Sequence, residues 1–385
     1  MSEACDLCGA VELRALPRPA GNRALRSDRR VVVGSLAKVE CQRCGLVRDA
    51  SPTAATPVYY RDEYRLDESD HVFHAVDGAH RRSAVFADWI CQALAASGQP
   101  GAPRRVLEIG ASRGHLLAEL ATRWPQAVCE GVELGVEAAA EARALGLNVR
   151  QGDTAALADA QYDVILAIAV VEHVPSPTAF IAEIRRLLAP GGRVVLIQPT
   201  QDVPSYDVFF VDHLHHFATA HLRGYSEKLG FTECYSQVGF AFMPNFSAHA
   251  WALAASPPAS WQWDSAPAGT SCAQALDTVL ADLWRLDQEA TALTHSGHRF
   301  AVFGLHEVFA LVRAYSSLEA TGIACGLDDS PDKTEYRAYS FPVMRPEDCA
   351  ATGVRDVFLT MNRIYYGLAS ERLRTLGLVA HPVLS

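Results

Sequence analysis

Short aliphatic runs alternate with amphipathic stretches of helical length through the middle of the chain. The β-branched and aliphatic runs at 106–109 and 194–198 predict buried strands, and a longer apolar run at 162–174 predicts another. Apolar residues at helical spacing predict helices over 78–96 and 176–189. This alternation of strands and helices indicates an α/β fold.

A second α/β unit is predicted towards the end of the chain. Cys272 to Thr294 carries its leucines and valine on one stripe, which predicts a long amphipathic helix. In this unit, Gly304 alone matches the glycines of a nucleotide-binding fingerprint, so we expect no second nucleotide cofactor. The other predicted elements are strands at 299–303, 322–327 and 355–361 and helices starting near 306 and over 368–376.

A sharp turn follows the strand that ends at Ile109. Gly110 and Gly114 punctuate this turn, and His115 opens the next amphipathic helix. Glycine lets the backbone pass close to a ligand, and the helix start offers unpaired N–H groups to a polar group. Ser112 occupies the place of the middle glycine of a dinucleotide fingerprint. The turn therefore predicts a cradle for a small molecule.

Three acidic residues end successive predicted strands beside this turn. Glu108 ends the first strand, and Glu133 in G-V-E-L ends the next, where a carboxylate can bind two ribose hydroxyls. Asp153 in V-R-Q-G-D ends another strand, where its side chain can reach an adenine amino group. The turn Pro190 to Arg193 then leads into the strand at 194–198.

The motifs L-E-I-G-A-S-R-G, G-V-E-L, Q-G-D, V-V-E-H-V and L-L-A-P-G-G-R-V-V-L-I together resemble those of class I S-adenosylmethionine-dependent methyltransferases. The rival is an NAD-binding dehydrogenase, which would favour an intact Gly-x-Gly-x-x-Gly and lacks the L-L-A-P-G-G-R segment. The resemblance implies a Rossmann-like core and S-adenosylmethionine as cofactor. The residues that it implies at the cofactor are Glu108, Gly110, Ala111, Gly114, Glu133, Asp153 and Ala169.

Composition narrows the class of protein further. The chain has 385 residues, 49% hydrophobic and 20% charged, which is typical of a globular protein with a sizeable core. The net charge of −10, without a long basic run, disfavours nucleic acid as a partner and opposes an RNA methyltransferase. We expect a cytoplasmic protein, because the N-terminus lacks a secretory pattern and no apolar run is long enough for a membrane span.

Four cysteines near the N-terminus are arranged as two C-x-x-C pairs. Cys5 and Cys8 form the first pair and Cys41 and Cys44 the second, and each pair is followed by glycine. Four thiolates placed in this way predict a closed, structural zinc site; a redox pair or coincidence are the alternatives. Ribbon strands are predicted at 29–33 and 36–39. The six other cysteines are scattered, which suits a reducing compartment.

The segment 198–219 follows the last parallel strand and is rich in titratable residues. Such a segment lies beside the cofactor crevice, and so many titratable groups are seldom core packing. General-base chemistry, a metal site and a polar loop are the three interpretations. The candidate metal ligands are Asp212, His213, His215 and His216. In a strand, His213 would share a face with His215, whereas in a helix it would share a face with His216.

The four-cysteine module, this core and the α/β tail together resemble the three-domain family of zinc-containing sugar C-methyltransferases. The resemblance implies methylation at carbon 3 of a nucleotide-linked 4-keto deoxysugar. It implies His213 as the general base, with Asp212 in the place of the family's glutamate and His216 nearby as a further catalytic candidate. The pocket around His306 and Asp328 is a candidate contact for the distal part of the acceptor.

The sequence departs from that family at the catalytic segment. Phe210 replaces the family's tyrosine and Val211 its first histidine, and His216-Phe217-Ala218 stands for its Tyr-Phe-Ser. Asn245 to Trp251 replaces a later His-Gly-Gly-Ser stretch. These departures affect the acceptor more than the reaction class. An O- or N-methyltransferase of a natural-product intermediate is the alternative, and a silent cofactor-binding protein is a further one.

The predicted organisation has four parts. The tyrosine-rich segment 59–64 either packs the module on the core or forms an arm over the cofactor or acceptor. We expect a small-molecule acceptor such as a nucleotide sugar, neither nucleic acid nor membrane as a partner, and a monomer or homodimer. The parts are a zinc module at 1–56, a methyltransferase core at 57–255, a proline-rich linker and helix at 256–297, and a C-terminal α/β domain at 298–385.

Overall fold

A computed structural model describes two compact units. The described residues are 4–51, 56–64, 70–75, 78–99, 101–256, 260–268 and 271–385. The large unit comprises residues up to 16, 37–207 and 212–272, and the second unit comprises 17–36, 208–211 and 273–385. The proline-rich linker predicted at the start of residues 256–297 lies partly outside the described residues.

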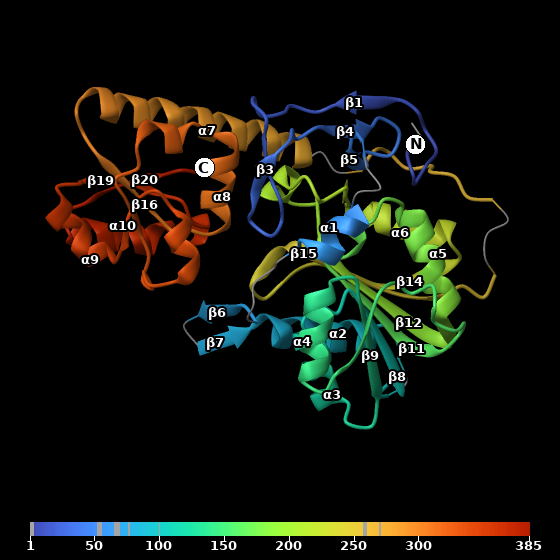
Figure 1. The fold of residues 1–385 in the computed structure, drawn as a ribbon. Coiled ribbons are helices and arrows are strands. Elements are labelled where there is room, and N and C mark those ends of the chain that lie inside the picture. Colours follow the sequence, from blue (N-terminus) through green and yellow to red (C-terminus); the bar gives the residue numbers. More distant parts are fainter. Residues whose placement is uncertain are drawn as a thin grey trace. The chain divides into compact units, whose positions relative to one another are not determined.

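The large unit is built on a seven-stranded sheet of order β10-β9-β8-β11-β12-β15-β14 (Figure 1). Neighbours are parallel from β10 to β12, whereas β15 is antiparallel to both β12 and β14. The chain order runs outwards from β8 and β11, so the crevice at their carboxyl ends is where ligands bind in such sheets. The strands are β8 Arg105–Ile109, β9 Val128–Glu133, β10 Asn148–Gln151, β11 Tyr162–Ile168, β12 Leu188–Pro199, β14 Phe231–Phe240 and β15 Met243–Leu253.

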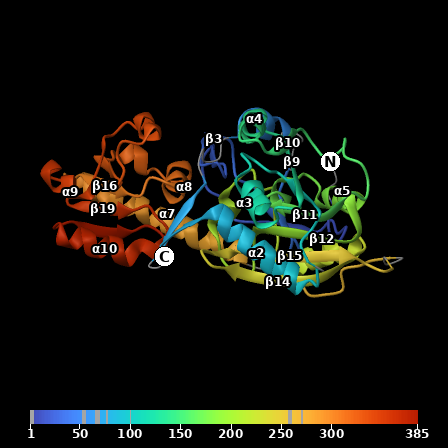
Figure 2. The ribbon, with the colours of Figure 1, turned by 90° about the horizontal axis from the view of Figure 1, so that it is seen from below.

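Alternating side chains on the central strands bury both faces of this sheet. Val106 and Leu166 point to one face, where they pack with Trp89, and Leu107 and Ile165 point to the other. Figure 2 shows α2 lying along the sheet on the first face. Helices α2 and α3 supply the first face and α5 and α6 the second. The helices are α2 Arg82–Ala96, α3 His115–Arg123, α4 Val136–Ala144, α5 Pro177–Leu187 and α6 Thr219–Lys228.

The predicted core elements are present, with three corrected boundaries. The strand predicted at 162–174 ends at Ile168, because Ala169 has φ +54° and a 3-10 turn, η1 Val171–His173, follows. The helix predicted from residue 78 begins at Arg82; residues Gly78–Arg81 form β7, which pairs with β6 Val72–Ala75. The turn predicted at 190–193 lies inside β12, where the register with β11 shifts.

The cysteine-bearing segments form a small sheet of order β1-β4-β5-β13 in the large unit. Its strands are β1 Leu13–Ala15, β4 Lys38–Cys41, β5 Val47–Asp49 and β13 His215–His216, and the short helix α1 Thr56–Asp62 follows in sequence. The ribbon strands predicted at 29–33 and 36–39 both exist, but they belong to different sheets. β3 Val31–Val33 pairs with β2 Arg23–Leu25 and not with β4.

Residues 17–36 cluster with the C-terminal part of the chain and not with the four-cysteine module in which they were predicted. The hydroxyl of Tyr315 explains this grouping. It accepts a hydrogen bond from the Leu25 N–H at 3.0 Å and donates one to the Phe209 carbonyl at 2.6 Å. The backbone of Val211 also bonds to Leu25, at 2.9 Å, so residues 208–211 join the same unit.

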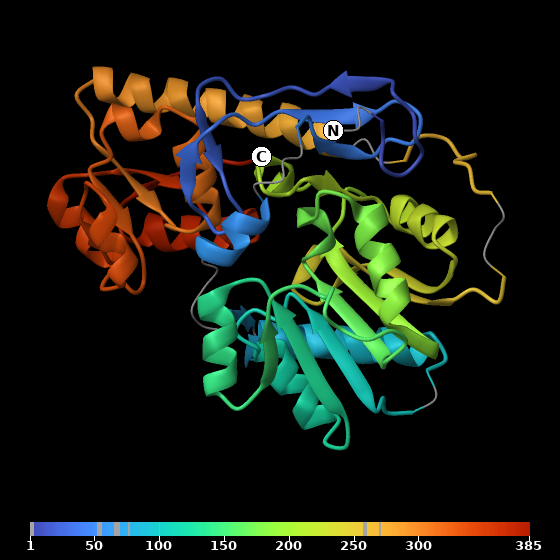
Figure 3. The ribbon, with the colours of Figure 1, turned by 45° about the vertical axis from the view of Figure 1, so that its right-hand side comes forward.

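The second unit holds a five-stranded sheet of order β18-β17-β16-β19-β20, parallel throughout. This is the Rossmann-like arrangement predicted for the C-terminal domain. The long helix α7, orange in Figure 3, carries the predicted stripe, and Leu276, Leu283 and Leu286 on it are buried. The elements are α7 Ser271–His295, β16 Phe300–Phe303, α8 Glu307–Tyr315, β17 Cys325–Leu327, β18 Val343–Met344, α9 Pro346–Cys349, β19 Asp356–Leu359, α10 Tyr366–Thr375 and β20 Val379–Pro382.

Short 3-10 turns complete the described elements. They are η2 Tyr206–Phe209, η3 Leu318–Thr321, η4 Thr334–Ala338, η5 Ala350–Thr352 and η6 Arg363–Tyr365. Across the part of the chain that the structure describes, none of the helices combines the length and apolarity needed to cross a bilayer.

Candidate functional site

The predicted glycine turn forms at the carboxyl end of β8. Gly110 has φ +77°, and a Cβ added there would lie 2.7 Å from Cγ2 of Val170 at the end of β11. The N–H groups of Gly110 and Ala111 both donate to the Val132 carbonyl, at 2.9 and 3.1 Å. The turn is therefore fixed against β9, and Gly114 then leads into α3.

Glu133 organises the next turn with both of its carboxylate oxygens. Oε2 accepts the Ser112 N–H at 2.7 Å, and Oε1 accepts the Gly135 N–H at 2.7 Å. Glu108 lies on β8, 4% exposed, and its Oε2 has no hydrogen-bond partner among the described residues. Burial, together with the charge of Glu133, raises the pKa of Glu108 well above its usual range.

The remaining predicted cofactor residues end the neighbouring strands. Asp153 follows β10 and is exposed, with Oδ1 accepting the Ala155 N–H at 3.0 Å. Ala169 follows β11, is exposed, and bonds through its N–H to the Ile197 carbonyl at 2.7 Å. The sheet thus brings the whole predicted set to one edge. The open lone pairs of Glu108 and the cradle at Gly110 fit a nucleoside with hydroxyl donors.

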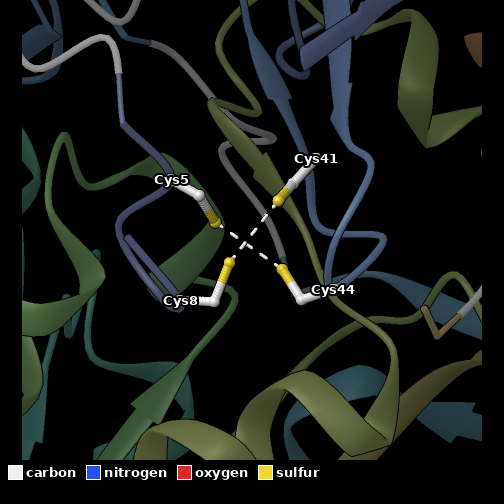
Figure 4. A group of neighbouring side chains, drawn as sticks. All are labelled: Cys5, Cys8, Cys41 and Cys44. Atoms are coloured by element: carbon white, nitrogen blue, oxygen red, sulfur yellow. Dashed lines mark hydrogen bonds between the residues drawn. The ribbon is translucent and has the colours of Figure 1, made fainter. Parts of the chain in front are cut away.

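The four predicted metal ligands converge (Figure 4). Sγ of Cys5 lies 3.6 Å from Sγ of Cys44, and Sγ of Cys8 lies 3.5 Å from Sγ of Cys41. A tetrahedral Zn–S bond of about 2.3 Å sets neighbouring sulfurs roughly 3.8 Å apart. The observed spacing agrees with that geometry to within a few tenths of an ångström, so the residues fit zinc.

The two C-x-x-C turns repeat one hydrogen-bond pattern. Gly9 N–H donates to the Cys5 carbonyl at 2.9 Å, and Gly45 N–H donates to the Cys41 carbonyl at 2.8 Å. Each first cysteine also donates its N–H to a carbonyl five residues later, at 2.8 and 2.9 Å. His221 of α6 lies 2.8 Å through Nε2 from the Cys44 carbonyl, and this hydrogen bond anchors the second turn to the core.

The histidine-rich segment lies on the small cysteine-bearing sheet, because β13 pairs antiparallel with β5. Oδ2 of Asp207 lies 3.0 Å from Nδ1 of His216 and 3.5 Å from Nδ1 of His213. His215, between them, stacks on Phe217. His213 and His216 therefore share a carboxylate without sharing an element, since β13 contains His216 and not His213.

Asp207 is a functional candidate that sequence reasoning missed. Its pKa lies below the usual range: burial pushes it up, but the hydrogen bonds of His213 and His216 outweigh burial. Burial lowers the pKa of His216 to about 4. Burial also opposes the charged form of His213, yet Asp207, Glu172 and Asp212 together raise its pKa above the usual value. His213 is thus the most basic imidazole of the cluster.

Asp212 contacts Tyr60 and His173 within the cluster. Its Oδ2 accepts the Tyr60 hydroxyl at 3.2 Å, and its carbonyl oxygen lies 2.9 Å from Nδ1 of His173. Because a carbonyl only accepts, Nδ1 of His173 carries the proton and Nε2 keeps its lone pair. Tyr60 also hydrogen-bonds His173, and its own carbonyl lies beside Gly135 of the cofactor crevice. The segment 59–64 therefore contacts both sites.

Glu172, His173 and Lys38 complete the cluster, and none of them was singled out from the sequence. Glu172 and His173 were visible only as part of V-V-E-H-V, and nothing in the spacing linked them to residues 207–216. Lys38 is buried and donates from Nζ to the His213 carbonyl at 2.6 Å. Burial lowers the pKa of Lys38.

Three groups within the described residues have metal-ligand spacing. One is the four cysteines, and the others share His213: Glu172 with His173, and Asp207 with His216. In each group one ligand atom per residue lies within 4.8 Å of the others. His215 and Asp212, which the metal interpretation included, are in none of these groups.

The comparisons with known proteins identify the core. Residues 79–240 match the family model described as "Methyltransferase domain". Trans-aconitate 2-methyltransferase of Mycobacterium sp. (strain KMS) is 33% identical over 107 residues, 27% of this chain and 42% of that protein. Ubiquinone biosynthesis O-methyltransferase of Aeromonas salmonicida (strain A449) is 29% identical over 136 residues, 33% of this chain and 55% of that protein. The chain thus spans about half the length of these relatives.

Two solved structures each align with less than half of this chain. The plantazolicin methyltransferase BpumL gives a TM-score of 0.37 at 15% identity, covering 44% of this chain and 83% of that one. The CurJ carbon methyltransferase gives a TM-score of 0.38 at 19% identity, covering 45% and 54%. The sheet order and the family match together give residues 79–240 the class I methyltransferase fold.

Proposed function

We propose that the protein transfers a methyl group from S-adenosylmethionine to a small-molecule acceptor, namely a carbon of a nucleotide-linked keto-deoxysugar or related biosynthetic intermediate. One observation carries this proposal. Tyr60 spans from Gly135 in the cofactor crevice to His173 and Asp212 in the buried acid–base cluster. The acid–base groups therefore lie next to the strand ends at which the methyl donor would bind.

S-adenosylmethionine, when bound, supplies an electrophilic methyl group. The residues of this chain then have two tasks, alignment and proton removal. Glu133 and Glu108 would hold the ribose side of the nucleoside, and Asp153 would reach its base. His213 would take a proton from the carbon next to the acceptor's ketone, because it is the most basic imidazole of the cluster.

The proposal is tested by separating cofactor binding from turnover. Calorimetry should show binding of S-adenosylhomocysteine to the purified chain. With nucleotide-linked 4-keto-6-deoxysugars as acceptors, His213→Ala should lower turnover at least about a hundredfold while cofactor affinity is kept. Unchanged turnover would remove His213 from the mechanism, and failure to bind the cofactor analogue would remove the methyltransferase assignment for this chain.

The alternative proposal is that the methylated atom is an oxygen or a nitrogen and not a carbon. An O- or N-methyltransferase is favoured by the replacement of the family's tyrosine and histidine by Phe210 and Val211, and by a relative that is named an O-methyltransferase. Carbon-13 NMR of the product formed with a labelled methyl donor distinguishes the two, because methyl groups on carbon, oxygen and nitrogen resonate in different ranges.

We also propose a structural zinc ion at the four cysteines. The Sγ spacing and the paired turns support it, and four protein ligands leave no open position for catalysis. Elemental analysis of the purified chain should give one zinc per chain, and Cys44→Ser should reduce it. Absence of zinc in the unsubstituted protein would refute this assignment.

A further inference from the structure

Glu172 is a buried carboxylate that no partner accounts for. Its side chain follows β11 in the η1 turn, and the residue is 1% exposed. Neither carboxylate oxygen has a hydrogen-bond partner in the part of the chain that the structure describes. Burying an unpaired carboxylate costs several kcal/mol of free energy. Such a group is therefore normally protonated or paired with a cation.

The group that Glu172 faces is His213. One carboxylate oxygen of Glu172 and one nitrogen each of His173 and His213 lie within 4.8 Å of one another. The rings of His173 and His213 meet edge to face, with centroids 4.7 Å apart. Since His173 keeps its Nδ1 proton on the Asp212 carbonyl, its Nε2 has only a lone pair to offer. His213 is therefore the neighbour that can exchange a proton with Glu172.

The other carboxylates around His213 already have hydrogen-bond or ion-pair partners. Asp207 receives both His213 and His216, and Asp212 receives Tyr60. The remaining titratable neighbours are Lys38, which donates to the His213 carbonyl, and Cys272, which interacts electrostatically with Asp207 and Lys38. Of these described groups, Glu172 alone has two open acceptor oxygens.

We infer that Glu172 is a positioning residue for His213: its carboxylate stabilises the imidazolium that forms when His213 removes the acceptor's proton, and then holds that proton until product leaves. This inference rests on the proposed function. His213 is 5% exposed, so an internal proton acceptor is needed during turnover. The ligand atoms of Glu172 and His213 lie within 4.8 Å of each other, which places the carboxylate beside the imidazole that would give up its proton.

The proton and electrons balance as follows. The acceptor's C–H bond breaks, its proton goes to His213, and its electron pair forms the new bond to the methyl carbon. The bond between sulfur and the methyl carbon breaks, and its electron pair stays on sulfur, which becomes neutral. The imidazolium proton passes to the Glu172 carboxylate, and it leaves to solvent when the product is released.

The test uses Glu172→Gln, which keeps the shape and removes the charge. Glu183→Gln is the control, because Glu183 pairs with Arg186 on the surface of α5. The first readout needs no acceptor: NMR of nitrogen-15-labelled histidine in the S-adenosylhomocysteine complex follows the pKa of His213. Removing a nearby negative charge disfavours the imidazolium, so the pKa should fall by about one to three pH units in Glu172→Gln.

The second readout is turnover against pH. Glu172→Gln should lose at least about tenfold in kcat, its acidic limb should move to lower pH with the pKa of His213, and cofactor affinity should stay unchanged. Glu172→Asp keeps the charge and should recover part of both effects. The NMR arm reads the Glu172–His213 pair even if none of the acceptors is turned over, so it separates this inference from the proposed reaction.

Three results would overturn the inference. The first is a pKa of His213 that is the same in Glu172→Gln and in the control. The second is a pH profile and kcat of Glu172→Gln that match those of the unsubstituted enzyme. A second equivalent of metal, present in the unsubstituted chain and lost in Glu172→Gln, would show that the open oxygens bind a cation and not a proton. If Glu172→Gln does not fold, the comparison of Glu172→Asp with the control decides.

Discussion

The substitution Glu133→Gln tests the cofactor crevice most directly. Glu133 receives two backbone N–H groups, from Ser112 and Gly135, each at 2.7 Å. A glutamine amide offers one oxygen and one NH2 group, so it can satisfy only one of these donors and places its NH2 against the other. The Ser112 N–H is exposed and can turn to water, so losing one of these hydrogen bonds should lower the free energy of unfolding by about 1 kcal/mol.

The effect on cofactor affinity is separate and larger. A carboxylate can accept both ribose hydroxyls, whereas the amide oxygen can accept one and without charge assistance. Losing one charge-assisted hydrogen bond and weakening another amounts to about 3 kcal/mol. At about 1.4 kcal/mol per tenfold, the dissociation constant should rise by roughly 150-fold.

Isothermal titration calorimetry with S-adenosylhomocysteine measures this change. Glu130→Gln is the matched control, because Glu130 lies on the same strand but pairs with Arg105 at 3.1 Å and has no part in the crevice. The control should bind within about threefold of the unsubstituted chain, since surface ion pairs contribute about 0–1 kcal/mol. If Glu133→Gln bound as tightly as the control while remaining folded, the carboxylate would not hold the ribose.

Three further outcomes are expected. Gly45→Ala should lower the free energy of unfolding by at least about 2 kcal/mol more than Gly9→Ala in urea titrations, because both glycines have positive φ but only the Gly45 Cβ would meet a carbonyl, that of Ala268 at 2.1 Å. Equal losses would refute the clash. Asp6→Asn should lower the thermal midpoint at pH 7, and this difference should shrink as the pH falls below about 4: burial raises the pKa of Asp6, but hydrogen bonds from Thr178 and Ser176 outweigh burial and lower it, so its stabilisation is lost on acidification. A pH-independent difference would contradict this. Chelation of the metal with a strong chelator should lower the thermal midpoint of the unsubstituted chain and leave that of Cys44→Ser little changed; equal shifts would contradict zinc at these cysteines.

Local patterns in the sequence were enough to predict the core strands and the cofactor edge. The β-branched run before Gly110 and the acids at Glu108, Glu133 and Asp153 lie at strand ends, and strand ends of a parallel sheet meet at one edge. The spacing of the four cysteines was likewise sufficient to bring their sulfurs together, because each pair lies in one turn. In both cases the deciding contacts are short-range or follow from the fold class.

The acid–base cluster could be predicted only in part. His213 and His216 were recognisable from their segment, but their shared carboxylate, Asp207, lies nine residues before His216 in an irregular turn. Glu172 and Lys38 come from distant parts of the chain and reach His213 only through tertiary packing. No periodicity relates such residues, so the three-dimensional arrangement was needed to connect them.

The chain passes between the two units after residues 16, 36, 207, 211 and 272. No single truncation can therefore release either unit whole: cutting after residue 272 leaves the hairpin 17–36 without the sheet it belongs with. The loop 208–211 belongs to the second unit, and it joins Asp207 to Asp212, which both belong to the acid–base cluster.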